Sequence, residues 1–410
     1  MLAKRSLEKE DKSNIITLGS IAKKLKSEDP SVINSTIGMM YDEDGKLFVF
    51  DSINKVLNDL SNEEKFAYAP TEGNKEYQEA LKKWLFKGHY DLFKNQSIVS
   101  ATPGGSGALS NSFSNYLNSG DKALLPSYMW GNYKQMLYEN NQGYLCYDLF
   151  DEYGCFNLED LKKKAYELKR TQDRILIVIN DPCQNPTGYS MRQSEFRNLI
   201  VLLNELSSDG TNVILVHDLA YLDFDVNPYF VNRSNLELYD NIKDNVLVIL
   251  AFSGSKSFGL YGLRVGAMVG ISKDEKVLEE FSRANKFSSR SKWSNTTNLG
   301  MNLISKIILD EKLLDKYIKE INYVSNLLND RANLFKALAI KYSLHLLNYK
   351  SGFFLTIPTN HPWEVYEDLV KEKIHIIPMD KCIRVTLSSI SMVEIERMVE
   401  VIARIIKLHS

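Results

Sequence analysis

The feature of this sequence that most limits its fold is an alternation of short apolar runs with helix-like segments through the middle of the chain. Runs of strand length, rich in β-branched residues, lie at 97–101, 175–180, 213–218 and 246–253. Strands that alternate with helices are joined by crossovers, which produce a mainly parallel sheet covered on both faces. We therefore predict an α/β fold.

The C-terminal part of the chain has a different pattern. From about residue 274 helical periodicity dominates, and the last segment alternates short strand-like and helical stretches in the manner of an α+β unit. We predict a large, mainly parallel-sheet domain over residues 49–299. A smaller α+β domain is expected from residues 1–48 together with 300–410.

Composition and charge exclude several classes of protein. The 410 residues are 44% hydrophobic and 25% charged, as in a soluble globular protein, and the net charge of -2 leaves no overall positive field for nucleic acid or an anionic membrane. No apolar run reaches the roughly 18 residues of a membrane span, and the N-terminal residues lack the apolar core of a secretory signal. The four cysteines have no C-x-x-C spacing, which argues against a metal site and disulfides. We expect a cytoplasmic protein without a metal.

The most informative motif begins with S-G-S-K, directly after the run at 246–253. Lys256 is flanked by small hydroxyl residues and is suited to a Schiff base with a carbonyl cofactor. Ser253, Ser255 and Arg264 could donate hydrogen bonds to a phosphate. A surface lysine beside a glycine-rich loop is the plainer interpretation, and this motif alone does not decide between the two.

A second glycine-rich motif, T-P-G-G-S-G, joins a predicted strand to a predicted helix at 102–107. Glycines let the backbone approach a phosphate closely, and the N–H groups at a helix start face it with a favourable dipole. Gly105 and Ser106 are therefore candidate anion ligands. The same pattern also occurs where a turn is simply tight, so alone it is weak.

Polar residues also follow two other predicted strands. Asn185 lies in the motif N-D-P-C-Q-N-P-T-G, and Asp218 and Tyr221 lie at the end of the run at 213–218. An aspartate at the carboxyl end of a parallel strand can hold a protonated ring nitrogen, while an asparagine and a tyrosine can bind a ring hydroxyl. Taken separately, an Asn-Pro turn and a helix-capping Asp are more common. Together, these motifs are expected to converge at one edge of the sheet.

In this combination the sequence resembles the fold-type-I pyridoxal-phosphate aminotransferases, and within them the aspartate and aromatic amino acid aminotransferases. The resemblance covers nearly the whole chain and is carried by S-x-S-K-x-x-x-L-Y-x-x-R-V-G and N-P-T-G in this order and spacing. It implies pyridoxal 5′-phosphate as cofactor, a homodimer with composite active sites, and transfer of an amino group between an L-amino acid and a 2-oxo acid such as 2-oxoglutarate.

The resemblance also implies cofactor-binding roles. Lys256 would form the Schiff base and shuttle a proton, and Asp218 would pair with the pyridinium nitrogen. Asn185 and Tyr221 would bind the 3′-oxygen, and Trp130 would stack on the ring. The residues implied to hold the phosphate are Gly105, Ser106, Ser253, Ser255 and Arg264, with Tyr68 from a second subunit.

The substrate-binding roles come from the same resemblance. Arg384 would form a forked pair with the α-carboxylate, a geometry that lysine cannot reproduce, and Asn185 and the backbone of Gly38 would assist it. Arg290, contributed by the partner subunit, would bind the side-chain carboxylate of aspartate or glutamate. A solvated surface arginine is the alternative for Arg290.

Several residues depart from the family pattern. Tyr133 stands where aspartate-specific members usually carry a histidine, Asn180 and Gln184 replace histidines, and Thr296-Thr297 replaces a common Pro-Pro. These changes could alter the electronic properties of the cofactor. The residues that could widen or soften the pocket toward aromatic or thioether substrates are Met39, Met40, Tyr128 and Met129.

Two other functions are compatible with parts of this pattern. A carbon–sulfur β-lyase or a decarboxylase could use the same scaffold, because the same cofactor-bound intermediate can react further in several ways. A regulator that binds the cofactor without catalysis is a third hypothesis. The presence of Lys256, Asp218 and Arg384, and the absence of an appended DNA-binding helix pair or basic arm, argue against it.

Overall fold

The computed structural model describes the chain except residues 3–5, 8, 10–14, 227–230, 232 and 410. The chain divides into two compact units. The large unit is Leu47–Asp330 with Asn348–Phe353, and the small unit is Met1–Lys46 with Arg331–Leu347 and Phe354–Ser410.

The large unit contains a mainly parallel sheet with strand order β2-β8-β7-β6-β5-β3-β4. β8 runs antiparallel to both of its neighbours, β2 and β7, whereas the other pairings are parallel. The α/β fold expected from the sequence is therefore confirmed. The strands are β2 (Ser97–Thr102), β3 (Lys122–Pro126), β4 (Gly143–Tyr147), β5 (Arg174–Asn180), β6 (Asn212–Asp218), β7 (Val246–Ser253) and β8 (Gly266–Ile271).

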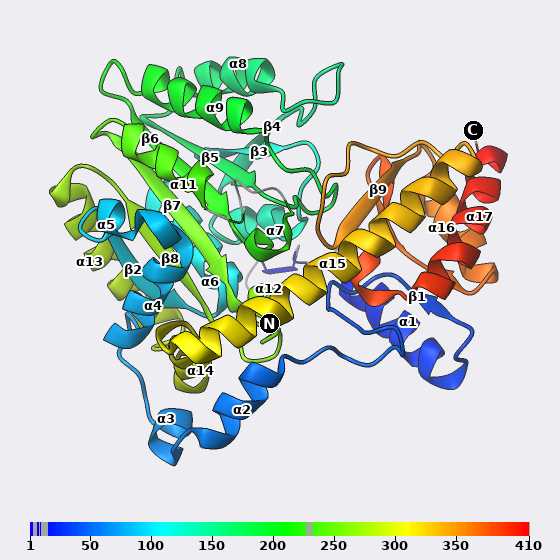
Figure 1. Cartoon of the computed structure of the whole chain (residues 1–410). Coiled ribbons are helices and arrows are strands. Elements are labelled where there is room, and N and C mark those ends of the chain that lie inside the picture. The colour runs from blue at the N-terminus through cyan, green and yellow to red at the C-terminus, as the bar shows by residue number, and fades with distance from the viewer. Residues whose placement is uncertain (3–5, 8, 10–14, 227–230, 232, 410) are drawn as a thin grey trace. The chain divides into compact units, whose positions relative to one another are not determined.

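Helices cover both faces of this sheet (Figure 1). On one face, alternate strand residues such as Ile214 and Val216 pack into a core with α6 (Gly104–Tyr116) and α7 (Asn132–Glu139). On the other face, His217 packs against Phe196 of α9 (Gln193–Leu206). Because both faces are buried, the central strands are nearly continuously apolar.

The remaining helices of the large unit complete its two outer layers and its edge. They are α2 (Asp51–Asp59), α3 (Asn62–Phe66), α4 (Lys75–Phe86), α5 (Tyr90–Phe93), α8 (Leu158–Leu168), α11 (Ser234–Glu237), α12 (Gly254–Ser257), α13 (Glu275–Lys292) and α14 (Asn298–Leu309), with 3-10 helices η2 (Lys87–His89), η3 (Leu222–Phe224) and η4 (Leu238–Asn241).

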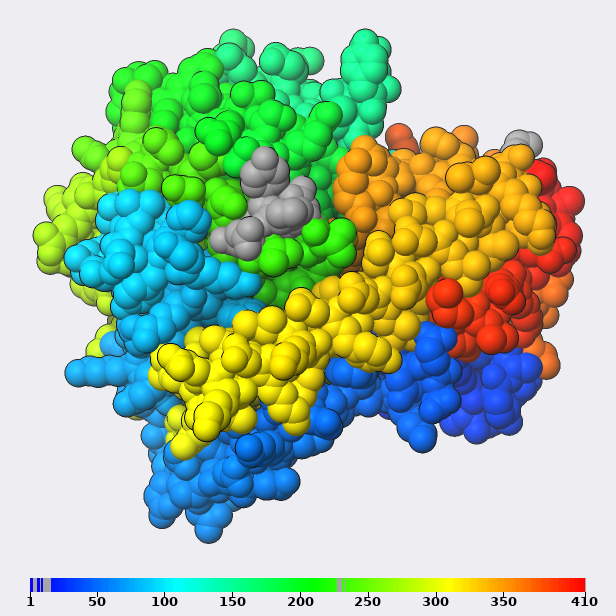
Figure 2. Space-filling model, in the orientation of Figure 1, coloured from blue at the N-terminus to red at the C-terminus, as the bar shows by residue number. Residues whose placement is uncertain are grey.

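The large unit extends further along the chain than the expected limit at residue 299. α14 packs against α2, α3 and α4, and the unit continues through the first part of α15 (Glu311–Lys341) to Asp330. Figure 2 shows the yellow residues of this region beside the blue residues of α2 and α3. Helical periodicity marks α14 as a helix but does not reveal which unit it packs on.

The small unit is an α+β structure. Its antiparallel sheet has the order β11-β12-β9, and β1 pairs in parallel with β10. Its strands are β1 (Ile33–Asn34), β9 (Phe354–Pro358), β10 (Ile374–His375), β11 (Ile377–Met379) and β12 (Cys382–Thr386). Its helices are α1 (Ile15–Glu28), α16 (Pro362–Lys371), α17 (Met392–Leu408), the 3-10 helix η5 (Leu387–Ser389) and the last part of α15.

Among the described helices, none is long and apolar enough to cross a membrane. The described residues also contain no group of three His, Cys, Asp or Glu side chains that could hold a metal ion.

Candidate active site

Lys256 lies immediately after β7, in the short helix α12. Ser253 caps this helix, because its Oγ accepts a hydrogen bond from the backbone N–H of Ser255 at 3.3 Å. A Cβ at Gly254 would lie 2.9 Å from Val265 Cγ1, so glycine allows the chain to turn tightly against the end of the loop. Lys256 is half-buried, and its Nζ lies 4.9 Å from the centre of the Tyr261 ring.

A cluster of hydrogen-bond donors surrounds the N-terminus of α6. Thr102 at the end of β2 and Ser253 at the end of β7 both pair with Gly266 of β8, which brings the start of α6 beside Ser253. Gly104 has a φ of +69°, and a Cβ there would lie 2.8 Å from Arg264 Nη2. A side chain at this position would therefore collide with the guanidinium.

The geometry of this cluster fits a phosphate. Arg264 Nη1 donates to Ser255 Oγ at 2.9 Å, and no described side chain caps the first turn of α6. Backbone N–H groups at such a helix start bind anions. The structure thus brings together the residues predicted to hold a phosphate, namely Gly105, Ser106, Ser253, Ser255 and Arg264.

Asp218 is a buried carboxylate at the end of β6. It follows the same alternation as Ile214 and Val216, so it faces the α6 and α7 side of the sheet. Its Oδ2 accepts a hydrogen bond from the Tyr133 hydroxyl at 2.6 Å, and its Oδ1 accepts one from the backbone N–H of Ala220 at 3.0 Å. Burial raises the pKa of Asp218 to about 6, while these two hydrogen bonds act in the opposite direction.

Asn185 and Tyr221 follow the neighbouring strands β5 and β6, and both are buried. Asn180 joins these strand ends. Its Oδ1 accepts from the Asn185 backbone N–H at 2.7 Å, and its Nδ2 donates to the Asp218 backbone carbonyl at 2.9 Å. The residue that departs from the family pattern at position 180 therefore aligns the loop of Asn185 with the end of β6.

Trp130 lies between β3 and α7 and is half-buried. Its ring meets the ring of Tyr133 edge-on, with centres 5.7 Å apart. The backbone N–H of Tyr133 donates to the Trp130 carbonyl at 3.1 Å, so the two aromatic residues belong to one turn at the start of α7.

In the small unit, Arg384 lies on β12 and is 4% exposed. Its Nη2 donates to the Thr36 carbonyl at 2.9 Å, and its guanidinium carbon lies 4.3 Å from the centre of the Phe354 ring. Gly38 follows Thr36 by two residues, so the segment that carries Gly38 is tied to β12. The sequence motifs gave no signal for the parts played by Thr36 and Phe354.

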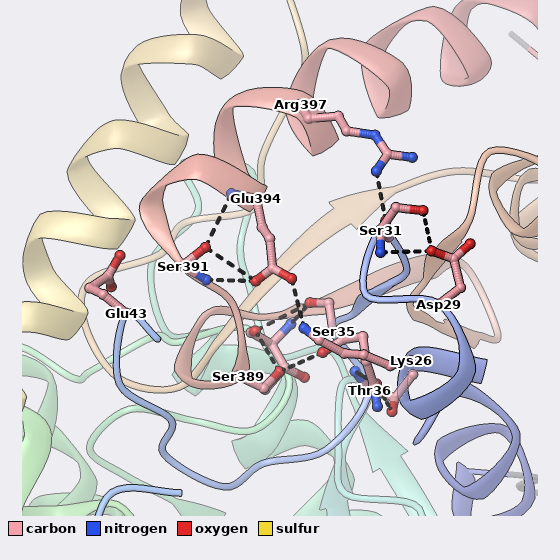
Figure 3. A network of polar contacts seen from close by, with 12 residues as sticks. Lys26, Asp29, Ser31, Ser35, Thr36, Glu43, Ser389, Ser391, Glu394 and Arg397 are labelled. Atoms are coloured by element: carbon pink, nitrogen blue, oxygen red, sulfur yellow. Dashed lines mark hydrogen bonds and ion pairs between the residues drawn. The ribbon is translucent and has the colours of Figure 1, made fainter. Parts of the chain in front are cut away.

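Further hydrogen bonds hold the N-terminal segment against the end of β12 (Figure 3). Ser35 Oγ accepts from the Thr386 N–H at 2.7 Å, and Ser389 Oγ donates to the Asn34 carbonyl at 3.0 Å. The buried guanidinium of Arg331 pairs with Glu43 at 2.7 Å. It also donates to the carbonyls of Tyr41, Leu387 and Ser388.

Tyr68 and Arg290, which are predicted to serve a partner subunit, lie at the surface of the large unit. The Tyr68 side chain is 94% exposed. Arg290 is also exposed, and its Nη1 donates to Ser294 Oγ. The contacts described above for the Lys256 and Asp218 regions involve neither side chain.

Comparison with known proteins agrees with this arrangement. The model of the family "Aminotransferase class I and II" matches residues 30–402. The mitochondrial aspartate aminotransferase of Xenopus tropicalis is 24% identical over 319 residues, which are 76% of this chain and 73% of that protein. The aromatic-amino-acid aminotransferase of Escherichia coli is 24% identical over 343 residues, which are 80% and 83%.

Solved structures give the same result. An aminotransferase from Anaerococcus prevotii has a TM-score of 0.94 and 31% sequence identity, with 99% of each chain covered. The cytoplasmic aspartate aminotransferase of Saccharomyces cerevisiae has a TM-score of 0.85 at 15% identity, with 98% of each chain covered. The resemblance and the fold type expected from the motifs are confirmed.

Proposed function

The chain belongs to the class I and II aminotransferases, which use pyridoxal phosphate, and we propose that its substrates are glutamate, aspartate or aromatic L-amino acids and a 2-oxo acid such as 2-oxoglutarate. The bound cofactor supplies an aldehyde that bonds to an amino group and a ring that takes up the electron pair of the substrate Cα–H bond. The observation that carries the proposal is the convergence of Lys256, the donor cluster at α6 and Asp218 at one edge of one sheet.

The residues present fit this cofactor. The uncapped start of α6 and the Arg264 guanidinium match its phosphate, and the amino group of Lys256 matches its aldehyde. We assign to Lys256 the covalent hold on the cofactor. The Lys256 amino group would also be the base that takes the proton from the substrate Cα.

Asp218 and its neighbours act on the cofactor ring. The Asp218 carboxylate holds a proton on the ring nitrogen, which keeps the ring an effective electron acceptor. Asn185 and Tyr221 would donate to the 3′-oxygen, and Trp130 would stack on the ring face. The position of Asp218 at the end of β6, and of Asn185 and Tyr221 after the ends of the adjacent parallel strands β5 and β6, supports these roles.

We assign binding of the substrate α-carboxylate to Arg384, assisted by Asn185 and the backbone of Gly38. A planar guanidinium offers two parallel N–H donors to a carboxylate. The Thr36 carbonyl and the Phe354 ring hold the orientation of this guanidinium. Arg384 therefore sets the position of every amino acid substrate, whatever its side chain.

We also propose a homodimer in which Tyr68 contacts the partner's cofactor phosphate and Arg290 contacts the side-chain carboxylate of the partner's acidic substrate. Large aromatic side chains near both residues are exposed, Phe66 to 78% and Phe287 to 77%. Exposed aromatic residues of this size are typical of protein interfaces. Their position supports an interface that includes Tyr68 and Arg290.

A carbon–sulfur lyase or a decarboxylase is not favoured, because the family match and the relatives reported above are aminotransferases. We propose a cytoplasmic location. One relative, the cytoplasmic aspartate aminotransferase of Dictyostelium discoideum, supports this location.

The test is a half-reaction panel. The cofactor-loaded protein is mixed with one amino acid at a time, and the absorbance of the bound cofactor is followed from the aldehyde to the amine form. Conversion by glutamate, aspartate or an aromatic amino acid, reversed by 2-oxoglutarate, is the expected result. Release of carbon dioxide or of a sulfur leaving group, with no amine form recovered, would refute an aminotransferase.

A further inference from the structure

The Tyr133 side chain has a contact that the assigned roles leave unexplained. It is fully buried, and its hydroxyl donates to Asp218 Oδ2 at 2.6 Å, across 85 positions of sequence. Burial and the nearby carboxylate raise the pKa of the Tyr133 phenol well above 10.0, so it remains a neutral hydrogen-bond donor throughout the working range of pH.

The two oxygens of Asp218 are engaged in a defined way. Oδ2 accepts from Tyr133 and Oδ1 accepts from the Ala220 backbone N–H at 3.0 Å. A carboxylate oxygen has two lone pairs, so each can accept a further bond from a cofactor ring. The two donors fix the plane of the carboxylate, and with it the direction from which a third donor can approach.

The hydrogen bond from Tyr133 also lowers the proton affinity of the carboxylate. In a buried pair of a carboxylate and a pyridinium, one proton lies on either the ring nitrogen or the acid. A donor to the carboxylate stabilises its ionised form and thereby leaves the proton on the nitrogen. Without that donor, transfer of the proton to Asp218 gives a neutral acid and a neutral ring, which accepts electrons less well.

Tyr133 is itself held by the residue assigned to the ring face. Trp130 and Tyr133 share one turn at the start of α7, joined by a backbone hydrogen bond of 3.1 Å, and their rings meet edge-on. The same turn therefore carries Trp130, which is assigned to the face of the cofactor ring, and Tyr133, which acts on the ring nitrogen through Asp218.

We propose that Tyr133 is a positioning residue that orients the Asp218 carboxylate and keeps the shared proton on the cofactor ring nitrogen. This inference rests on the proposed function, because it assumes that pyridoxal phosphate binds with its nitrogen at Asp218. It adds to that function a residue that acts through Asp218 and touches neither substrate nor cofactor.

The test compares Tyr133→Phe with Tyr147→Phe. Tyr147 is also fully buried, and its hydroxyl donates to the Val178 carbonyl at 3.1 Å, so its variant removes a buried hydroxyl without touching Asp218. The readout is the ¹⁵N resonance of bound pyridoxal phosphate labelled at the ring nitrogen, together with its dissociation constant. We expect Tyr133→Phe to shift the resonance toward the unprotonated value and to weaken binding about tenfold or more. Tyr147→Phe should change neither.

A protonated resonance and unchanged affinity in a folded Tyr133→Phe protein would overturn the inference. If that variant does not fold, site-specific fluorotyrosine at position 133 keeps the shape and supplies a stronger donor. The ¹⁵N resonance should then lie at or beyond the wild-type value on the protonated side, and a shift toward the unprotonated value would overturn the inference. Failure of the proposed function is distinguishable, because the wild-type protein would then take up no pyridoxal phosphate.

Discussion

The two units hold their polar site residues in different ways. In the large unit, Asp218 is the last residue of β6, and Lys256 and the donors at α6 lie just beyond strand ends, where a strand turns into a helix or loop. In the small unit, Arg384 lies within β12 and is oriented by Thr36, 348 positions away in sequence. The first arrangement is built from local turns and the second from long-range contacts. We expect changes at the strand ends of the large unit, such as Lys256, to affect the chemical step, and changes around β12 of the small unit to affect substrate recognition and local stability.

The largest effect is expected in the large unit. Lys256→Ala should abolish turnover, because it removes both the covalent hold and the group that moves the Cα proton. The phosphate donors lie on other residues, so cofactor binding should be partly retained. Steady-state assays and the absorbance of the bound cofactor measure the two properties. Turnover by the variant at the wild-type rate, or a colourless wild-type protein, would contradict these roles.

The small unit should show the largest effect on stability, at Arg331. Arg331→Met removes the donors to three backbone carbonyls and the pair with Glu43, and we expect a loss of about 2–4 kcal/mol in the free energy of unfolding. Urea unfolding followed by circular dichroism measures it. The control is Glu43→Gln, because the amide keeps an oxygen that can accept from Arg331 and the Glu43 side chain is 41% exposed, so this substitution should cost less than Arg331→Met. Equal losses in the two variants would show that the buried carbonyls do not matter.

The free energy of unfolding should depend on pH because of Asp218, the buried carboxylate of the large unit. The pKa of Asp218 is raised from 3.8 to about 6, so the folded, cofactor-free protein binds this proton more tightly than the unfolded chain. The resulting stability is complete below pH 4 and is lost as the pH rises through 6, by about 3 kcal/mol.

This effect is measured as the wild type minus Asp218→Asn, both without cofactor, in urea unfolding between pH 4 and 7. The difference should fall with rising pH, since the asparagine does not titrate. His217, whose pKa is lowered to about 4 by burial, titrates in the opposite sense but is present in both proteins and cancels. A difference that is constant with pH would refute the raised pKa.

Arg384 tests substrate recognition in the small unit. Arg384→Lys should lower kcat/KM by roughly ten- to a hundredfold for acidic and aromatic amino acids alike, because a point charge replaces a planar fork. Arg397→Lys is the matched control. Arg397 is an exposed arginine of α17 that donates to the Ser31 carbonyl (Figure 3). It also donates to the Glu372 carbonyl. A loss of kcat/KM confined to one class of amino acid would show that Arg384 does not bind the α-carboxylate.

The smallest expected effect is selective and concerns Arg290 at the surface of the large unit. Arg290→Leu should lower kcat/KM for aspartate and glutamate about tenfold, while phenylalanine and tyrosine change little, because only the acids carry a second carboxylate. Parallel kcat/KM measurements on the four amino acids test this. Equal losses of kcat/KM for acidic and aromatic amino acids would show that Arg290 does not discriminate between substrate side chains.

The contrast between the units also explains what could be predicted from the sequence. A strand followed by a glycine-rich helix start, or by S-x-S-K, is a local pattern, so the large-unit residues were identifiable before their geometry was known. The hydrogen bond of Tyr133 to Asp218 joins residues 85 positions apart, and periodicity does not encode it. The Phe354 ring under Arg384 was missed for the same reason, since a phenylalanine in an apolar strand gives no separate signal.

The antiparallel direction of β8 has a consequence for the choice of cofactor. Because β7 and β8 are antiparallel neighbours, a single short loop joins them, and it carries both Lys256 and Arg264. A parallel strand of six residues would have placed Arg264 about 20 Å away, at the opposite edge. The proposed covalent anchor, Lys256, and the proposed ionic anchor, Arg264, thus lie on one loop, which sets the distance between them. A cofactor whose aldehyde and phosphate are separated by more or fewer bonds than in pyridoxal 5′-phosphate should engage one anchor and miss the other.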